Sequence, residues 1–188
     1  MTTFDTLIPA KRISFQVAWE STLKCNLDCS YCGDGHDNST QHPALAECLD
    51  TVDFIYKYVD IKMQQRPESQ RFANLNIQGG ESIFHPKILD ILKYVKEKKN
   101  NYNWYMGVAT ITNAVIGKNL WQRVVEYIDY YTISYHPEAS KRSKELVKNN
   151  ILYLKNKDKV INDLIEYRTN PVLQKPPRSI HLGMQIRF

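Results

Sequence analysis

The alternation of apolar residues between two periods limits the fold of this chain most. Segments with the two-residue period of a strand cover residues 13–19, 72–78, 105–112 and 130–134. Segments with a helical period follow them at about 43–63, 86–99, 120–128 and 140–154. Strands that alternate with helices of this length form parallel βαβ units with right-handed crossovers. The sequence therefore predicts an α/β fold, with a curved parallel sheet or partial (β/α) barrel covered by helices.

The regular pattern covers only part of the chain. The 188 residues, 43% of them hydrophobic, suffice for a single domain with a sizeable core, which we expect over residues 1–188 with its regular part at about 13–155. From Val160 to Arg178 no clear apolar period is visible, and only Ile180–Ile186 reads as another strand. We interpret 156–188 as a divergent or incomplete C-terminal segment, with the barrel truncated after four or five βα units.

Charge and hydropathy set the expected surroundings of the chain. No apolar run is long enough to span a membrane, and the N-terminus lacks the order of a signal peptide, so we expect a cytoplasmic protein with no membrane partner. Residues 141–188 hold 11 Lys and Arg against 4 Asp and Glu. Such a basic segment is most simply a solvated face, and binding to nucleic acid is the alternative.

Three cysteines lie within eight residues, in the sequence CNLDCSYC. Cys25, Cys29 and Cys32 are spaced to bind three irons of one 4Fe-4S cluster, which leaves the fourth iron for a ligand from outside the protein. In a reducing compartment, clustered cysteines more often bind metal than form disulfides. These three are the predicted metal ligands. Cys48 lies on the apolar stripe of the first helix, and we expect it to be a buried small hydrophobe.

Polar residues follow each of the next three strands. They are Gly79, Gly80 and Glu81 in GGES, then Thr112 and Asn113, then Ser134 and His136. Ligand sites in parallel α/β folds lie where the strands end, so we expect these residues around the cysteine loop. Their simpler interpretations are a glycine turn, an asparagine turn and a surface histidine. If position 114 requires a positive φ, Ala114 strains its turn.

The four motifs CNLDCSYC, GGES, ITNA and ISYHP, in this order, resemble the radical S-adenosylmethionine superfamily over about residues 13–155. The resemblance implies a partial barrel of the radical SAM type with a 4Fe-4S cluster on the three cysteines. The amino and carboxylate groups of S-adenosylmethionine would occupy the fourth iron. Reductive cleavage of this cofactor would give a 5′-deoxyadenosyl radical that abstracts hydrogen from a substrate, as the cofactor's own chemistry.

The resemblance also implies roles for single residues in cofactor binding. Tyr31 would lie near the adenine, and the Gly79–Glu81 stretch would bind the methionine amino group. Thr112 and Asn113 match part of a Thr-Asn-Gly motif, and Ser134 and His136 stand where the superfamily often places polar groups for ribose or carboxylate. His136 alternatively contacts substrate as a proton donor. The chain departs from the family at Ser82, where proline is usual, at Ala114, where glycine is usual, and in HLGMQI (181–186), which matches a glycine-rich motif only faintly.

Partners and competing functions stay open at this stage. By resemblance, the electron donor would be a flavodoxin- or ferredoxin-like protein, and the substrate a small metabolite, a nucleotide-like molecule or a peptide. A zinc site completed by His36 or His42 is one alternative to the cluster. A metal-binding basic module that contacts nucleic acid through 141–188 is a second. An inactive remnant, in which the loop persists on an incomplete barrel, is a third.

Overall fold

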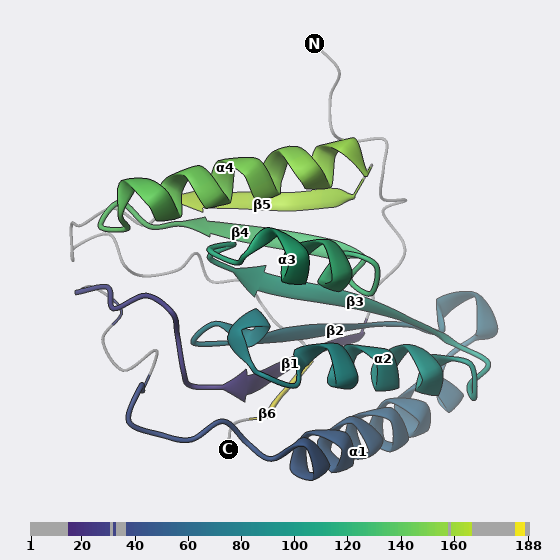
Figure 1. The fold of residues 1–188 in the computed structure, drawn as a ribbon. Coiled ribbons are helices and arrows are strands. Elements are labelled where there is room, and N and C mark those ends of the chain that lie inside the picture. Colours follow the sequence, from purple (N-terminus) through teal and green to yellow (C-terminus); the bar gives the residue numbers. More distant parts are fainter. Residues whose placement is uncertain (1–14, 31, 33–36, 158, 167–182, 187–188) are drawn as a thin grey trace.

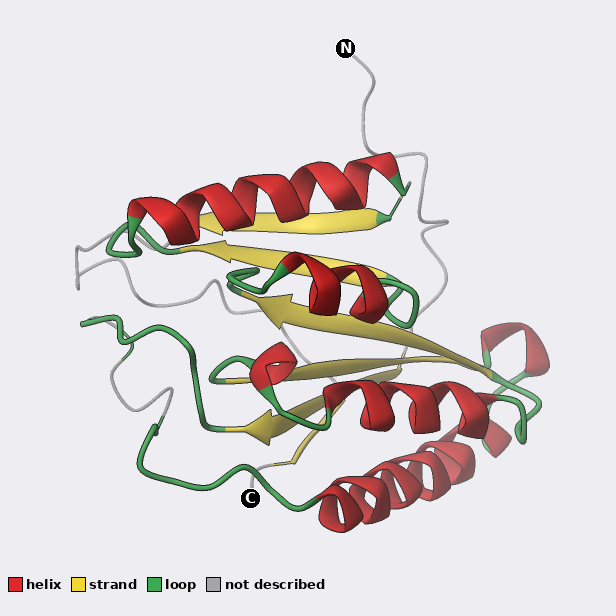
Figure 2. Cartoon of the chain, viewed as in Figure 1, coloured by secondary structure: helices red, strands yellow, loops and turns green. Residues whose placement is uncertain are grey.

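The computed structural model describes residues 15–30, 32, 37–157, 159–166 and 183–186 (Figure 1). In these ranges β-strands and helices alternate through most of the chain (Figure 2). The strands are β1 (Phe15–Thr22), β2 (Phe72–Gly79), β3 (Tyr105–Thr112), β4 (Tyr130–Tyr135), β5 (Val160–Glu166) and β6 (Gly183–Ile186). The α-helices are α1 (Leu45–Gln64), α2 (Ile88–Lys99), α3 (Lys118–Val124) and α4 (Lys141–Asn156), and short 3₁₀ helices cover Glu68–Gln70 (η3) and Ser82–Phe84 (η4).

The six described strands form one sheet in the order β5-β4-β3-β2-β1-β6, and every neighbouring pair is parallel. The four α-helices lie along one face of this sheet (Figure 1). The predicted α/β fold with a partial-barrel arrangement is confirmed. The outermost described strands are β5 and β6, so the order does not close into a ring.

Strand alternation places the core between sheet and helices. Val17 and Trp19 of β1 are fully buried, and so is Leu75 of β2. The α1 stripe meets them with Val52, Ile55, Val59 and Met63, all fully buried, because residues three and four apart share one helix face. Cys48 belongs to the same stripe and is 1% exposed, which confirms it as a buried hydrophobe.

One strand was not predicted. β5 (Val160–Glu166) pairs with β4 in a segment where the sequence shows no clear apolar period. The pairing of β5 with β4 shifts register between Tyr131 and Thr132. The two-residue alternation of inward and outward side chains is therefore interrupted in this pair of strands. The predicted strand at 180–186 corresponds to the shorter β6 (Gly183–Ile186) beside β1.

A membrane-spanning helix is not found in the described part of the chain, where no helix combines sufficient length with sufficient apolar character.

The loop after β3 is held by a side chain from α4. The Asn150 side-chain amide donates to the carbonyl oxygens of Ala114 and Ile116, at 3.0 and 2.8 Å. Asn150 is 4% exposed, so these carbonyls have little access to water. Ala114 has a φ of 53°, the left-handed region that disfavours alanine. The strain expected there from sequence is confirmed, and Asn150 helps to hold that conformation.

We expect Asn150→Ala to lower the free energy of unfolding by about 2 kcal/mol, because two buried carbonyls lose their donor. Asn149→Ala is the matched control, since its neighbour Asn149 is exposed on the same helix. Urea denaturation of both variants measures the difference. Equal effects of the two substitutions would contradict the role given to Asn150.

Candidate functional site

The cysteine loop begins where β1 ends, and the glycine pair at the end of β2 holds its base. Gly80 N donates to Thr22 O at 2.9 Å, and Glu81 N donates to Lys24 O at 2.8 Å. Gly79 has a φ of 143°, and a side chain on it would collide with the Thr22 carbonyl. A Cβ on Gly80 would lie 2.5 Å from the carbonyl oxygen of Lys24. The close approach that these glycines permit is therefore to the chain's own backbone, directly before Cys25.

Glu81 connects this loop base to the end of β3. Its carboxylate accepts hydrogen bonds from the Thr112 hydroxyl at 2.9 and 3.0 Å, from Asn113 N at 2.7 Å and from Ile83 N at 3.2 Å. Glu81 is 1% exposed, and burial raises its pKa to about 7 although these donors lower it. The carboxylate is thus directed at the protein's own donors and fixes the position of Asn113.

Asn113 reaches the first cysteine. Its Nδ2 donates to Asn26 Oδ1 at 2.8 Å and lies 3.6 Å from the Cys25 sulfur. Its Oδ1 accepts from Val115 N at 2.8 Å, so the side chain is held at both ends. The backbone N of Cys25 donates to Asn38 Oδ1 at 2.9 Å. One hydrogen-bonded path therefore runs from the buried Glu81 to the Cys25 thiol.

The end of β4 reaches the second cysteine. Ser134 Oγ lies 3.2 Å from Thr112 O and 2.9 Å from His136 Nε2, and His136 Nδ1 lies 3.3 Å from the Cys29 sulfur. Burial lowers the pKa of His136, which favours the neutral ring. Ser30 adds a further contact, because its backbone N donates to Glu138 at 2.9 Å. The loop after β4 thus holds the middle of the cysteine loop.

The three thiols influence one another. Burial raises the pKa of Cys25 to about 11, with smaller contributions from Glu81, Cys32 and Cys29. Burial, followed by the neighbouring Cys29, also raises the pKa of Cys32. Cys32 N donates to Cys29 O at 3.1 Å, which closes a turn between these two ligand candidates. At neutral pH Cys25 and Cys32 are therefore protonated, and binding of a metal would have to displace their protons.

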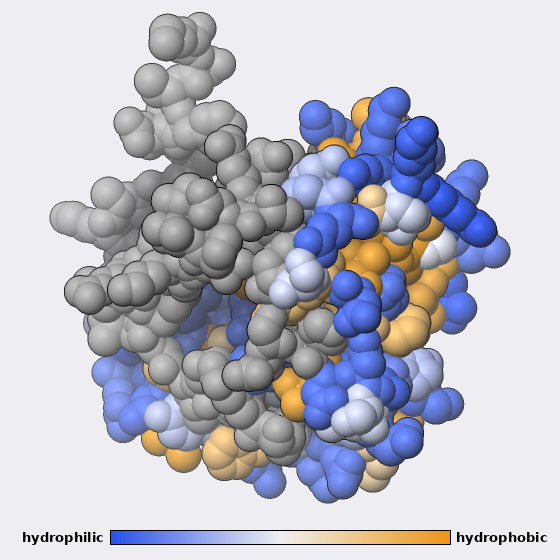
Figure 3. Space-filling view, turned by 90° about the vertical axis from the view of Figure 1, so that its left-hand side faces the viewer, coloured by the Kyte–Doolittle hydropathy of each residue, from blue (hydrophilic) through white to orange (hydrophobic). Residues whose placement is uncertain are grey.

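The strand ends bring together most of the residues predicted from sequence. Cys25 and Cys29 contact the groups after β3 and β4, and Glu81 joins the ends of β2 and β3. Figure 3 looks onto this edge of the sheet, where the arrows of Figure 1 end. Within the described residues, no group of three His, Cys, Asp or Glu side chains is positioned to hold a metal ion. Tyr31 and His36 lie outside the described residues.

His42 contacts the end of β1 and the residues around η4. Its Nδ1 lies 3.0 Å from Thr22 Oγ1, and its ring packs edge-on against His85 with centroids 5.0 Å apart. Its ring also meets Phe84 of η4 edge-on, at 5.8 Å. The contacts of His42 are therefore with the end of β1 and the segment around η4.

Sequence reasoning missed three supporting residues. Asn26 bridges Asn113 to the Val115 carbonyl, Asn38 accepts from Cys25 N, and Glu138 accepts from Ser30. Asn26 lies inside the cysteine motif, and Glu138 directly follows His136 and Pro137. Their position next to a motif is the only sequence feature that could have indicated a supporting role for these two residues. Most of their partners lie far away in sequence, and only the fold shows them.

Comparison with known proteins gives a distant structural likeness and no sequence match. No protein-family model matches the chain, and no curated protein matches it. Streptococcus suis SuiB bound to the precursor peptide SuiA gives a TM-score of 0.42 at 10% identity, covering 84% of this chain and 50% of SuiB. SuiB bound to S-adenosylmethionine gives 0.42 at 10% identity, covering 88% and 53%. The chain thus spans about half the length of these SuiB chains.

The buried Glu81 predicts a specific pH dependence of stability. The folded chain keeps its proton up to a pH of about 7, whereas an unfolded glutamate releases it near 4.5. The stability contributed by Glu81 therefore falls as pH rises between these values, by on the order of 3 kcal/mol. We expect the wild type to lose stability relative to Glu81→Gln as the pH rises across this range. Urea denaturation of both proteins at several pH values measures the difference between their free energies of unfolding.

Glu145→Gln provides the control, because Glu145 is exposed on α4. Its difference from the wild type should stay within about 0.5 kcal/mol over the same range. If the free energies of unfolding of the wild type and Glu81→Gln differ by the same amount at every pH, Glu81 carries the same charge in the folded and unfolded chain, which would contradict the prediction.

Proposed function

We propose that this chain is a radical S-adenosylmethionine enzyme with a 4Fe-4S cluster on Cys25, Cys29 and Cys32. The observation that carries the proposal is the placement of the cysteine loop. Cys25 and Cys29 each lie within hydrogen-bond reach of polar groups at the ends of β3 and β4. Three thiols on one loop are the donor set that iron-sulfur clusters use, so the chemistry of these residues fits the group. Cluster binding would have to draw together the three sulfurs, which the described structure does not group as metal ligands. When bound, the cluster and cofactor supply reductive cleavage and a radical for hydrogen abstraction.

The chain's own residues would position this cofactor. Asn113 donates toward the Cys25 sulfur, and a hydrogen bond to a ligand sulfur is one means by which proteins tune cluster potential. Glu81 holds Asn113 through its backbone N and is itself inaccessible to solvent. Its predicted role in cofactor binding thus becomes one of orientation. The carbonyl oxygens of Gly79 and Gly80, both half-buried, are the proposed acceptors for the methionine amino group, since the Gly80 N–H already donates to Thr22 O.

Groups at the C-terminal ends of β3 and β4 complete the proposed cofactor site. Thr112 and Ser134 are both buried. The Thr112 hydroxyl donates to Glu81, and the Ser134 hydroxyl donates to the Thr112 carbonyl oxygen. These two residues therefore support the loops that carry Asn113 and His136. His136 is half-buried beside Cys29 and neutral at pH 7. Tyr31 is proposed to face the adenine. The electron donor would be a flavodoxin- or ferredoxin-like protein, and the substrate class is open.

Anaerobic reconstitution with iron and sulfide tests this proposal. We expect about four irons per wild-type chain and near-complete loss in Cys29→Ala, because a loop with two thiols cannot hold the cluster stably. Cys48→Ala is the matched control, since Cys48 is a buried core residue on α1. It should keep its full iron content. A cluster of unchanged iron content in Cys29→Ala would overturn the assignment.

Reduction of the reconstituted protein with S-adenosylmethionine present separates the competing functions. Formation of 5′-deoxyadenosine, measured by chromatography, is the expected result. A bound cluster without this product would support the inactive remnant. Zinc in the purified protein, with salt-dependent binding to RNA or DNA, would instead support the basic module.

A further inference from the structure

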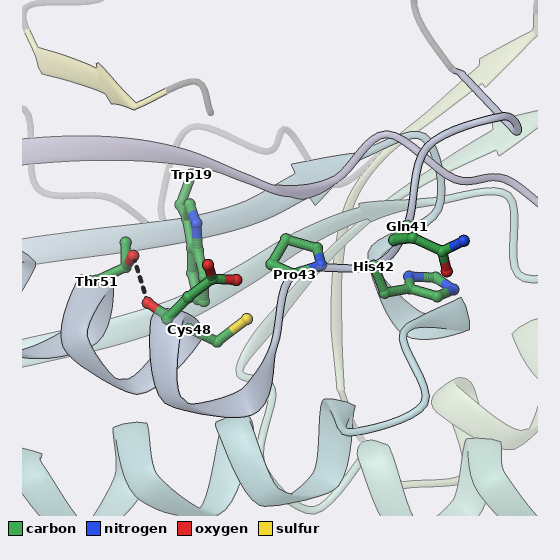
Figure 4. Close-up of a pocket in the computed structure, with 7 residues that line it drawn as sticks. Trp19, Gln41, His42, Pro43, Cys48 and Thr51 are labelled. Atoms are coloured by element: carbon green, nitrogen blue, oxygen red, sulfur yellow. Dashed lines mark hydrogen bonds between the residues drawn. The ribbon is translucent and has the colours of Figure 1, made fainter.

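The sheet face that points away from the helices carries polar side chains. Trp19 of β1 points toward α1, where it borders a cavity of about 360 Å³ (Figure 4). Because successive strand residues point to opposite faces, its neighbours Ala18 and Glu20 face away from the helices. On β2 the same alternation puts three carboxamides on this face, namely Asn74, Asn76 and Gln78.

A row of carboxamides is unusual in the middle of a parallel sheet. Parallel strands are normally apolar on both faces, and asparagine is depleted in strands. Strand β2 has β1 on one side and β3 on the other, so the row does not lie at an edge of the sheet. The four α-helices lie along the opposite face (Figure 1). Polar residues that stand against the local preference of a strand point to a function.

Two of the carboxamides offer accessible hydrogen-bonding atoms. Asn76 Nδ2 donates to Gln78 Oε1 at 2.9 Å. Among the described residues, Asn76 Oδ1 and Gln78 Nε2 have no hydrogen-bond partner, and neither is one of the polar atoms that are fully buried without a partner. Both residues are half-buried, so these atoms keep access to solvent. The first can accept from a ligand N–H and the second can donate to a ligand carbonyl, which together match an amide group.

Asn76 stands between two short side chains. The strand register puts Ala18 of β1 and Ala109 of β3 beside it. In the next row Asn74 pairs with Gly107, and a Cβ on that glycine would lie 2.3 Å from Asn74 Oδ1. The Asn74 side chain therefore occupies the space over Gly107, whereas only methyl groups flank Asn76. A ligand would approach this face at the row of Asn76.

One charged side chain borders the two carboxamides. Glu20 is the only charged residue within β1 to β4, and the strand register pairs it with Gln78. Neighbouring strands lie about 5 Å apart, so one small molecule can contact both side chains. Glu20 is half-buried, and a carboxylate has about four acceptor positions, so it can bind a ligand cation together with a donor from the protein. The charge complement of this position is an amino group.

These residues lie at the cysteine-loop end of the sheet. Glu20 is close to the end of β1 that leads into the loop, and Gln78 directly precedes Gly79. We propose that Asn76, Gln78 and Glu20 bind a small amide that carries a cationic amino group about 5 Å from its amide. That this molecule is the substrate class rests on the proposed function, whereas its binding does not.

β-Alaninamide and butanamide test this proposal as a matched pair, because they have the same shape and only β-alaninamide carries an ammonium group at neutral pH. Side-chain amide resonances of the ¹⁵N-labelled, cluster-free full chain report binding, and Gln78→Ala identifies those of Gln78. We expect β-alaninamide to shift the resonances of Asn76 and Gln78 and to bind about fivefold more tightly than butanamide, the gain of one half-exposed ion pair.

Glu20→Gln should remove this preference and keep the affinity for butanamide, because the variant retains the shape of the side chain and loses its charge. Glu145→Gln, on the exposed side of α4, is the matched control and should keep the preference. The wild-type spectra decide the matter even if Glu20→Gln does not fold. Equal affinities for the two probes would overturn the proposal, and so would Gln78 resonances that stay in place at about 50 mM β-alaninamide.

The experiment separates this inference from the proposed function, since the binding measurement needs no cluster. Selective binding without formation of 5′-deoxyadenosine by the reconstituted protein would uphold the site and contradict the enzyme. Formation of 5′-deoxyadenosine without selective binding would support the enzyme and overturn the assignment of Asn76, Gln78 and Glu20.

Discussion

The buried carboxylate of Glu81 is the interaction on which the arrangement of the strand ends depends. It follows β2 and accepts from Thr112, the last residue of β3, and from Asn113, the next residue. It lies one residue after Gly80, whose N–H donates to the end of β1. The Glu81 side chain thereby joins the ends of β2 and β3, and the backbone N–H groups of Gly80 and Glu81 hold the chain at the end of β1. Because the carboxylate is fully buried, its donors must all remain in place, and Asn113 is held against the cysteine loop as a consequence.

Much of the fold and part of the site could be predicted from sequence. Apolar periodicity located β1 to β4 and their helices, since each strand buries one face under an amphipathic helix. It missed β5, where Asn162 and Asp163 interrupt the apolar pattern. The motif residues Cys25, Asn113 and His136 were located by their place at strand ends. The bridge from Asn113 to Asn26, the contact of His136 with Cys29 and the inward direction of Glu81 could not be predicted, because those contacts join residues far apart in sequence.

Strand β1 borders two separate regions of the structure. Its end leads into the cysteine loop, and Thr22 there binds both Gly80 and His42. Its helix-facing side chain Trp19 forms the floor of a separate cavity beside α1. His42 lines that cavity and contacts Thr22, the last residue of the strand, so it lies between the two regions.

The central claim is that three protein sulfurs hold a cluster with one iron left for an exchangeable ligand. Mössbauer spectroscopy of oxygen-free, ⁵⁷Fe-reconstituted protein measures this directly, with and without S-adenosylmethionine. The account predicts that adding the cofactor changes the signal of one iron in four and leaves the other three unchanged. A spectrum in which all irons are insensitive to the cofactor, each saturated by protein ligands, would contradict it.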